Sequence, residues 1–322
     1  MLAELIKETQ VIKSFYRDFV KGNISHAYII CGPDQVLRMV MASTIAKLLL
    51  CEFGGCDTCK TCVKLDNNSH IDVKYFNTDE KFNVKAAESL TEDTYIKGWE
   101  SDIKLYFIDN ADSLNAQSQN KLLKVYEEPP AGVIIFLMVS EEASLLKTIV
   151  SRAKKIYLPV FSTVEIAAEL IERGITKSQA EMAAVFSGNR FDKAFKYAEE
   201  PEYNEIYERT FEILCSCTTT KLIAEFINDK IFSKESILVA LEFIEIILRD
   251  VLEYTVGGNA FTTINRDFDI KTIAKNFNPG SVSMALCVIP EARRRLTANV
   301  GVTTVAEKLL FEILEAKYKW RL

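Results

Sequence analysis

The chain has 322 residues and a mass of 36.5 kDa, a length typical of two or three domains. Hydrophobic residues make up 48% of it and charged residues 26%, so the composition predicts a buried core and excludes a fibrous or largely disordered protein. The net charge of −6 excludes a protein that holds DNA or RNA by bulk electrostatics alone, because phosphate binding requires basic surface.

The longest uninterrupted apolar run is residues 133–139, far shorter than the ~20 residues of a membrane-spanning helix. The N-terminal residues alternate between charged and apolar types and lack the continuous apolar stretch of a signal peptide. We therefore expect a cytoplasmic protein.

Five short apolar runs in the first half of the chain predict β-strands, and most segments between them are long enough for helices. The runs are residues 27–31, 73–76, 105–108, 133–139 and 155–158. Runs this continuous are expected in a sheet that is covered on both faces, so we predict a parallel sheet in an α/β domain. One helix is well marked over residues 115–128, and it ends where two prolines follow.

The residues after the first run lie where a nucleotide-binding α/β domain has its phosphate loop. Such a loop requires glycines for close approach to phosphate, a lysine for the phosphate charge and a hydroxyl for magnesium. The chain keeps Gly32 but has Gln35 and Leu37 where glycines are required. Arg38 replaces the lysine, and Met39, which cannot ligate magnesium, replaces the hydroxyl. The pattern favours a strand–turn–helix without a ligand over a divergent nucleotide site.

The third run is followed by Asp109, the residue type that orients magnesium in nucleotide-hydrolysing domains. The next residue, where a catalytic glutamate would polarise the attacking water, is Asn110, and an amide cannot act as a general base. Two separate parts of a hydrolase site are therefore missing. We predict that the chain does not hydrolyse ATP by itself.

Four of the eight cysteines fall within twelve residues, at Cys51, Cys56, Cys59 and Cys62. Gaps of four, two and two residues bring four thiolates within reach of one tetrahedral centre, which predicts a structural zinc site. Four thiolates would close that site and leave no position for a catalytic water. Unliganded thiols are the alternative, and His70 could replace one of the cysteines.

After residue 158 the pattern becomes helical, and no further strand is predicted. Capping residues at 162–165 and 176–179 predict two helices of a small domain. A last helix is predicted to start at a capping box that begins with Thr304.

Three domains are therefore predicted. The first is the α/β domain over residues 1–160, which includes the cysteine module at 51–62. A small helical domain over residues 161–203 follows, and then a larger all-helical domain over residues 204–322.

A set of motifs occurs in order along the chain and is dense between residues 25 and 160. The motifs are His26-Ala27-Tyr28, the cysteine cluster, Ser69-His70-Ile71-Asp72, Asp109-Asn110-Ala111-Asp112, Gln119-Asn120-Lys121-Leu122-Leu123-Lys124, Glu127-Glu128-Pro129-Pro130 and Thr148-Ile149-Val150-Ser151-Arg152. Together they resemble the clamp-loader subunits of bacterial DNA polymerase III. The cysteine cluster is shared with the gamma/tau subunits, while the altered phosphate loop is typical of the delta-prime subunits.

The resemblance implies an AAA+ nucleotide-binding-like domain, a helical lid and a helical collar that assembles a five-subunit ring. Such a ring loads the sliding clamp onto primed DNA at the replisome, and its other members are gamma/tau and delta subunits. The resemblance also implies that Arg152, supported by Ser151, reaches the ATP of a neighbouring gamma/tau subunit as an arginine finger. The chain would then need no nucleotide of its own and would have no independent enzyme activity.

Three positions bear on the match to that family pattern. The family's Ser-Arg-Cys motif has Ala153 in place of the cysteine, which we interpret as a packing change. The gap after Cys51 is shorter than the family's first gap. Arg190 lies where the family has its second nucleotide sensor, and with an altered phosphate loop we expect it to be structural.

Two other functions compete with this hypothesis. A gamma/tau-like clamp-loader ATPase with a divergent loop would bind ATP with magnesium. A free-standing zinc-module protein would bind nucleic acid, which the net charge of −6 disfavours.

Overall fold

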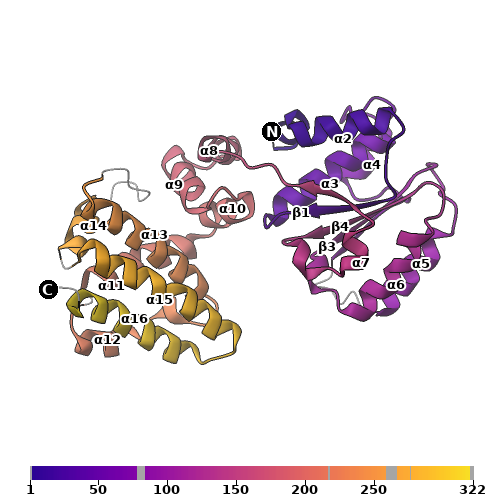
Figure 1. Cartoon of the computed structure of the whole chain (residues 1–322). Helices are drawn as coiled ribbons and strands as arrows, with labels where there is room; N and C mark the ends of the chain where they lie inside the picture. Colours follow the sequence, from indigo (N-terminus) through magenta and orange to yellow (C-terminus); the bar gives the residue numbers. More distant parts are fainter. Residues whose placement is uncertain (1, 78–83, 217, 259–266, 276, 320–322) are drawn as a thin grey trace. The chain divides into compact units, whose positions relative to one another are not determined.

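The computed structural model describes residues 2–77, 84–216, 218–258, 267–275 and 277–319. The chain forms two compact units, which Figure 1 colours along the sequence. The first unit contains Met1–Ser162 and Arg190–Asp192, and the second contains Thr163–Asn189 and Lys193–Leu322. The expected separation of residues 161–203 from residues 204–322 stays a prediction.

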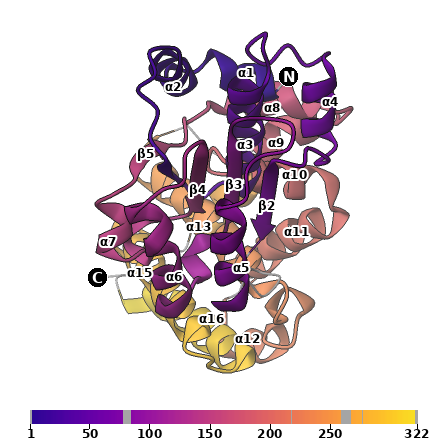
Figure 2. The same cartoon turned by 90° about the vertical axis from the view of Figure 1, so that its right-hand side faces the viewer.

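The first unit is built on five parallel strands in the order β2-β3-β4-β1-β5. The strands are β1 (Ala27–Cys31), β2 (Val73–Asn77), β3 (Lys104–Asp109), β4 (Val133–Val139) and β5 (Lys154–Tyr157). Figure 2 labels β5, β4, β3 and β2 across the sheet. β4 is buried along its whole length, which is why its sequence is a continuous apolar run. The five predicted strands, the parallel sheet and the α/β class are confirmed.

Helices cover both faces of this sheet (Figure 1). The helices on one face are α5 (Val84–Thr94), α6 (Ala116–Glu127) and α7 (Lys147–Val150), with short 3-10 turns at η2 (Ala111–Ser113) and η3 (Glu142–Ser144). Their buried side chains form one core cluster with Ile29 of β1, Ile108 of β3 and Ile135 of β4. Helix α6 starts where the sequence predicts, because the side chain of Asn115 accepts the backbone N–H of Ser118 at 2.8 Å.

Aromatic rings dominate the other face of the sheet. The helices on this side are α1 (Leu2–Glu8), α2 (Gln10–Val20), α3 (Gln35–Leu50) and α4 (Lys60–Asp66). Tyr75, Phe107, Phe136 and Tyr28 stack from strand to strand with successive ring centroids 5.0, 4.7 and 5.1 Å apart. Phe15 of α2 contacts Tyr28 edge-on at 5.4 Å. Each such pair contributes about 0.5–1.5 kcal/mol beyond the burial of its area, so the stack helps to hold the strand order.

The second unit contains only helices and turns in its described residues. Its elements are α8 (Thr163–Glu172), α9 (Lys177–Phe186), α10 (Phe191–Glu199), α11 (Pro201–Ser216), α12 (Thr220–Phe226), η4 (Lys230–Phe232), α13 (Ile237–Thr255), α14 (Asp267–Ala274), α15 (Pro279–Thr297) and α16 (Val302–Lys319). The first two residues of α10 belong to the first unit. Leu241, Ile244 and Leu248 recur at helical spacing on α13 and lie in the buried core of this unit.

The start of the last helix corrects the sequence prediction. Helix α16 begins at Val302, two residues before the expected cap at Thr304. The carbonyl oxygen of Gly301 accepts the backbone N–H of Val305 at 3.1 Å, and Val302 packs against the helical core. Packing of Val302 therefore outweighs the capping preference of Thr304. None of the described helices has the length and apolar composition needed to cross a membrane.

Candidate functional site

Helix α3 begins a few residues after β1, so its N-terminus lies where a phosphate loop would bind phosphate. The carboxylate of Asp34 caps this helix by accepting the backbone N–H of Leu37 at 2.9 Å. Asp34 also accepts the backbone N–H of Phe191, and the backbone N–H of Gln35 donates to the carboxylate of Asp192 at 3.3 Å. Amides that a phosphate would require are therefore bonded to carboxylates of the same chain.

The charge at this helix N-terminus is balanced within the chain. Arg190 donates to both carboxylate oxygens of Asp192, at 3.0 and 2.6 Å, and so compensates the charge that faces the helix. Burial raises the pKa of Asp34, the N–H of Leu37 lowers it, and the charge of Asp192 raises it again. Arg190, at the position expected for a nucleotide sensor, is thus paired with a carboxylate of its own chain, Asp192.

The side chain of Arg38 is only 2% exposed, and it joins the altered phosphate loop to the end of β3. Its guanidinium donates to Oδ1 of Asp109 at 3.0 Å, to the carbonyl oxygen of Gly32 at 2.7 Å and to Oδ1 of Asn110 at 2.7 Å. Oδ2 of Asp109 accepts from Nε2 of Gln35 at 2.9 Å. Both oxygens of the expected magnesium ligand are therefore bonded to side chains of the chain itself.

The remaining residues of the altered loop contribute to local structure. Leu37 is buried in the core, with 3% exposure, so its side chain does not project to where it would crowd a bound phosphate. Met39 is partly buried. Asn110 has a φ of 52°, in the left-handed region that asparagine tolerates better than most residues. Its side chain accepts from Arg38, so the amide that replaces a catalytic glutamate is a hydrogen-bond partner of a buried cation.

Arg152 follows the short helix α7 and lies on the surface, with 39% of its side chain exposed. Its guanidinium pairs with the carboxylate of Glu127 at 3.0 Å and donates to the carbonyl oxygen of Thr148 at 3.1 Å. The hydroxyl of Ser151 donates to the same carbonyl at 3.0 Å. The predicted Ser-Arg pair is thus placed on one turn, and Ala153 after it packs against the core.

Two side chains fix the loop that leads to α7. The carboxylate of Asp112 accepts the backbone N–H of Ser140 at 2.8 Å. The side-chain oxygen of Gln119 accepts the backbone N–H of Leu146 at 2.8 Å, directly before α7. Both residues stand in the sequence motifs, but their partners lie 28 and 27 residues away, so spacing alone did not predict this role.

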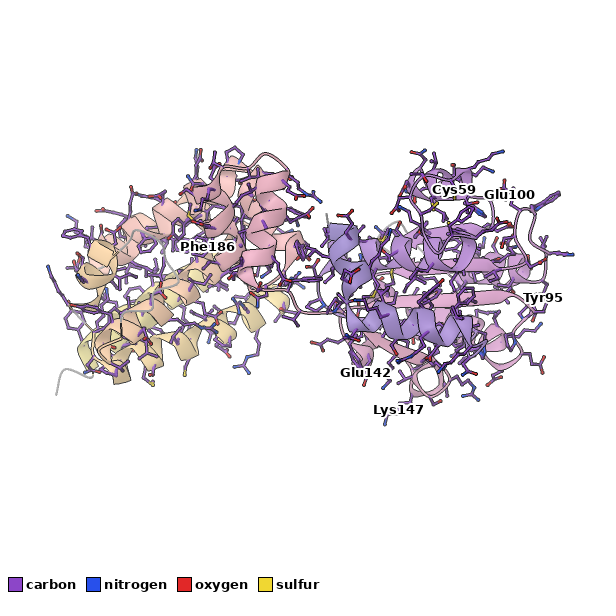
Figure 3. All side chains as sticks on the ribbon, turned by 90° about the horizontal axis from the view of Figure 1, so that it is seen from above. Cys59, Tyr95, Glu100, Glu142, Lys147 and Phe186 are labelled. Carbon is purple, nitrogen blue, oxygen red and sulfur yellow. The ribbon has the colours of Figure 1, made fainter. Side chains whose placement is uncertain are left out.

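The four cysteines of the cluster converge, with their sulfur atoms all within 4.8 Å of one another. Sγ of Cys51 lies 3.7 Å from Sγ of Cys56 and 3.7 Å from Sγ of Cys59, which is labelled in Figure 3. Tetrahedral Zn–S bonds of about 2.3 Å place sulfurs about 3.8 Å apart, so the cluster fits a zinc ion. Cys51 belongs to the group despite the short gap after it. His70 is not part of this group: its Nδ1 accepts the backbone N–H of Asp72 at 3.3 Å, and its Nε2 lies 3.9 Å from a carboxylate oxygen of Glu100.

The cysteine thiols differ strongly in acidity. Burial raises the pKa of Cys62 to about 12, while the backbone N–H of Thr58 lowers the pKa of Cys56 to about 6. Thiolates packed this closely repel one another, so a divalent cation would stabilise the deprotonated set.

Ion pairs tie the cysteine module to the rest of the first unit. Nζ of Lys47, a largely buried residue of α3, lies 2.7 Å from a carboxylate oxygen of Asp57 and 2.6 Å from one of Asp66. Lys7 of α1 pairs with Asp57 as well, and it donates to the carbonyl oxygen of Gly55 at 3.0 Å. The module is therefore an integral part of the α/β unit rather than a separate domain.

Comparison with known proteins agrees with this geometry. A protein-family profile described as "DNA polymerase III, delta subunit" matches residues 7–162. Over 320 residues the chain is 29% identical to DNA polymerase III subunit delta' of Bacillus subtilis, with 96% of each chain covered.

Two further relatives match about half of the chain. It is 28% identical over 167 residues to DNA polymerase III subunit gamma of Buchnera aphidicola and 27% identical over 172 residues to subunit tau of Escherichia coli. These matches cover 51% and 52% of this chain but only 46% and 27% of the two relatives.

Solved structures with similar chain paths were also found. A DNA polymerase III gamma subunit-related protein from Thermotoga maritima aligns with a TM-score of 0.47 and 16% identity, over 96% of this chain and 100% of that chain. A RuvB variant from the same organism aligns with a TM-score of 0.43 and 13% identity, over 97% of this chain and 87% of that chain.

The strand order, the altered phosphate loop and the helical second unit define an AAA+ protein, an α/β domain of the P-loop NTPase type joined to helical segments. Within that class, the chain is similar to subunits of the DNA polymerase III clamp loader, and over nearly its whole length it is similar to a delta-prime subunit. The resemblance stated from the sequence motifs is thereby confirmed.

Proposed function

We propose that this chain is a non-hydrolysing clamp-loader subunit that supplies Arg152 in trans to an ATP site on a neighbouring gamma/tau subunit. It assembles with gamma/tau and delta subunits into the five-membered ring that loads the sliding clamp onto primed DNA. In this ring residues 1–160 form the AAA+ domain, residues 161–203 the lid and residues 204–322 the collar.

The observation that carries the proposal is the internal occupation of the phosphate-loop region by Arg38. A nucleotide would have to displace a buried guanidinium that bonds Asp109, Asn110 and the Gly32 carbonyl. It would also compete with Asp34 and Asp192 for the amides of α3. Breaking a buried ion pair costs about 3–5 kcal/mol, which a bound nucleotide would have to offset before gaining any affinity.

The exposure of Arg152 supports its role as an arginine finger. A planar guanidinium pairs with phosphate oxygens in two parallel hydrogen bonds and stabilises charge as the phosphoryl group leaves. The present partner of Arg152, Glu127, is itself 50% exposed, so their ion pair is weak and can be exchanged for a phosphate. Asp112 and Gln119 would keep the preceding loop in place while the side chain moves.

We assign a structural zinc ion to Cys51, Cys56, Cys59 and Cys62. Zinc with four thiolates supplies folding free energy rather than catalysis. The ion pairs of Lys47 would transmit that stability to α3, the helix that carries Arg38.

Nucleotide binding by the purified chain tests this function. We expect no saturable binding of a fluorescent ATP analogue with magnesium at micromolar concentrations. Micromolar affinity would instead favour the gamma/tau-like ATPase, for which the partial matches to gamma and tau subunits speak. DNA binding by the isolated chain with a steep salt dependence would favour a nucleic-acid-binding zinc protein.

A further inference from the structure

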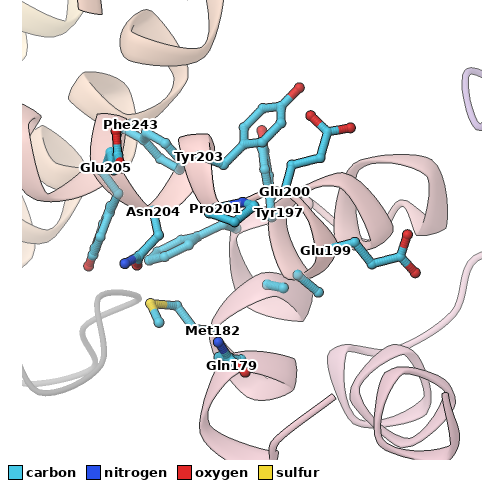
Figure 4. A pocket seen from close by; sticks show the side chains of 14 residues that line it. Gln179, Met182, Tyr197, Glu199, Glu200, Pro201, Tyr203, Asn204, Glu205 and Phe243 are labelled. Atoms are coloured by element: carbon cyan, nitrogen blue, oxygen red, sulfur yellow. The ribbon is translucent and has the colours of Figure 1, made fainter. Parts of the chain in front are cut away.

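A pocket lined by aromatic rings lies in the second unit (Figure 4). Its volume is about 550 Å³, within the range of about 300–1,000 Å³ that is common for binding sites. Helices α9, α10, α11 and α13 contribute the rings. The rings are Phe186, Tyr197, Tyr203, Tyr207 and Phe243.

The rings hold one another in fixed orientations. Phe186, labelled in Figure 3, lies with its ring centroid 4.7 Å from that of Tyr207 and 5.7 Å from that of Phe243. The Tyr197 ring contacts Tyr203 at 5.2 Å and Phe243 at 5.6 Å. Contacts of this kind make a preorganised aromatic wall, so a ligand would not have to order it.

The rim of the pocket carries negative charge only. Its lining includes Glu199, Glu200 and Glu205, all exposed, and no lysine or arginine. In the described part of the chain, no ion pair compensates any of these three carboxylates. The pKa of Tyr203 is raised by burial and then by Glu200 among other nearby carboxylates, which agrees with a negative potential at the pocket.

We propose that this pocket binds the side chain of an arginine presented by a partner protein. A guanidinium stacks on aromatic faces and pairs with carboxylates through its planar edge. Phe186, Tyr207 and Phe243 are buried, so the faces on offer are those of Tyr197 and Tyr203, which are partly exposed beside the rim carboxylates. Lysine matches the charge but cannot stack in the same way. Glu199 ends α10, Glu200 lies between α10 and α11, and Glu205 lies in α11; all three are exposed, so a partner surface can reach them.

The inference uses residues of the second unit alone and does not depend on the role of Arg152. Arginine binding at this pocket can therefore be tested independently of the proposed function. Failure of the nucleotide-binding test would leave this pocket unchanged, and failure of the test below would leave the arginine finger unchanged.

The test uses the full chain labelled with ¹³C at the methionine methyl groups. Of the six methionines, Met182 lines the pocket, while Met39 in the first unit serves as an internal reference. N-acetyl-arginine amide is titrated against N-acetyl-citrulline amide, a neutral molecule of nearly the same shape. We expect a saturable shift of the Met182 methyl at millimolar arginine amide, no such shift with citrulline amide, and no shift of Met39.

A charge-matched pair of variants then assigns the effect to the rim. Replacement of Glu199, Glu200 and Glu205 by Gln should weaken binding of arginine amide at least ~3-fold, since each exposed charge pair contributes a small amount. Replacement of exposed glutamates outside the pocket by Gln changes net charge equally and should leave binding unaltered; these are Glu172, Glu225 and Glu307.

Three results would overturn the proposal. Equal binding of citrulline amide would show that charge is irrelevant, and an equal loss in the control variant would show that only bulk charge matters. Tighter binding of tetramethylammonium than of arginine amide would assign the pocket to a small quaternary ammonium compound instead. Unchanged thermal unfolding of both variants verifies that the exposed substitutions leave the fold intact.

Discussion

Replacement of Arg152 by alanine separates the catalytic role that we propose for this residue from any structural one. We expect the variant to fold and to assemble with gamma/tau and delta subunits. The ATPase rate of the reconstituted loader should fall by the fraction that the ATP site next to Arg152 contributes to the total. The measurement is steady-state ATP hydrolysis by a complex whose composition has been verified by mass.

The magnitude follows from the surroundings of the guanidinium. An arginine finger accelerates phosphoryl transfer by about 10³–10⁵, or roughly 4–7 kcal/mol. In the free chain, Arg152 and Glu127 are 39% and 50% exposed, so their ion pair contributes about 0.2–1 kcal/mol. Loss of the side chain should therefore change the free energy of unfolding by no more than about 1 kcal/mol. Activity and stability should respond on different scales.

Two neighbouring glutamates provide the control. Glu127→Gln releases Arg152 from its ion pair and should change turnover by less than about 5-fold, because at most about 1 kcal/mol is involved. Glu128→Gln removes the same charge one residue later, where the described residues offer no ion pair, and should leave turnover unaltered. Full ATPase with Arg152→Ala in a complete complex would refute the finger role. A loss with Glu128→Gln as large as that with Arg152→Ala would show that general surface charge is being measured.

Three further predictions concern stability. Metal analysis of the native protein should find one zinc per chain, and absence of zinc would refute the site. Cys59→Ser should lower Tm by at least about 5 °C, whereas Cys287→Ser, which replaces an exposed cysteine outside the cluster, should not. Arg38→Met removes the cationic partner of the buried Asp109 carboxylate and should lower the free energy of unfolding, measured in urea, by about 3–5 kcal/mol. Adding Asp109→Asn should restore part of that stability, whereas no loss with Arg38→Met would contradict the internal ion pair. Burial tends to raise the pKa of Asp72, but three backbone N–H groups that donate to its carboxylate lower the pKa below the ordinary 3.8. Ionised Asp72 therefore stabilises the fold fully above pH 3.8, and this stabilisation is lost as the pH falls through the lowered pKa. Asp72→Asn should cost about 1–3 kcal/mol at neutral pH and remove part of the acid sensitivity, and an unaltered pH profile would contradict this.

The features that the sequence predicted well are those coded by neighbouring residues. β4 was found because a strand buried on both faces must be apolar along its length. The cysteine cluster was predicted because short gaps along the chain bring Cys51, Cys56, Cys59 and Cys62 together, and the structure confirms that their sulfur atoms converge, while zinc at this cluster stays a prediction. The helix at 115–128 was predicted because two prolines mark its end, and the structure adds the cap by Asn115 at its start.

Contacts between distant segments could not be predicted in the same way. Burial of Arg38 depends on Asp109 and Asn110, which lie 71 and 72 residues further along the chain. The aromatic pocket joins rings from Phe186 to Phe243, and no local pattern marks them as neighbours. The start of α16 was misplaced because packing of Val302 against the core is a tertiary effect that a capping pattern does not contain.

Arg38 and Arg152 carry the same functional group in opposite environments, with 2% and 39% of their side chains exposed. The buried guanidinium of Arg38 makes three hydrogen bonds inside the fold, one of them to the carboxylate of Asp109. Its positive charge is therefore neutralised by the chain itself, and no nucleotide phosphate is needed to neutralise it. Under the proposed function, that internal substitution would stabilise the AAA+ fold in place of a bound nucleotide. The exposed guanidinium has only a weak ion pair and a carbonyl contact, so it can exchange them for stronger charged acceptors. A chain with this distribution of its arginines is suited to stabilise charge on a partner rather than on itself.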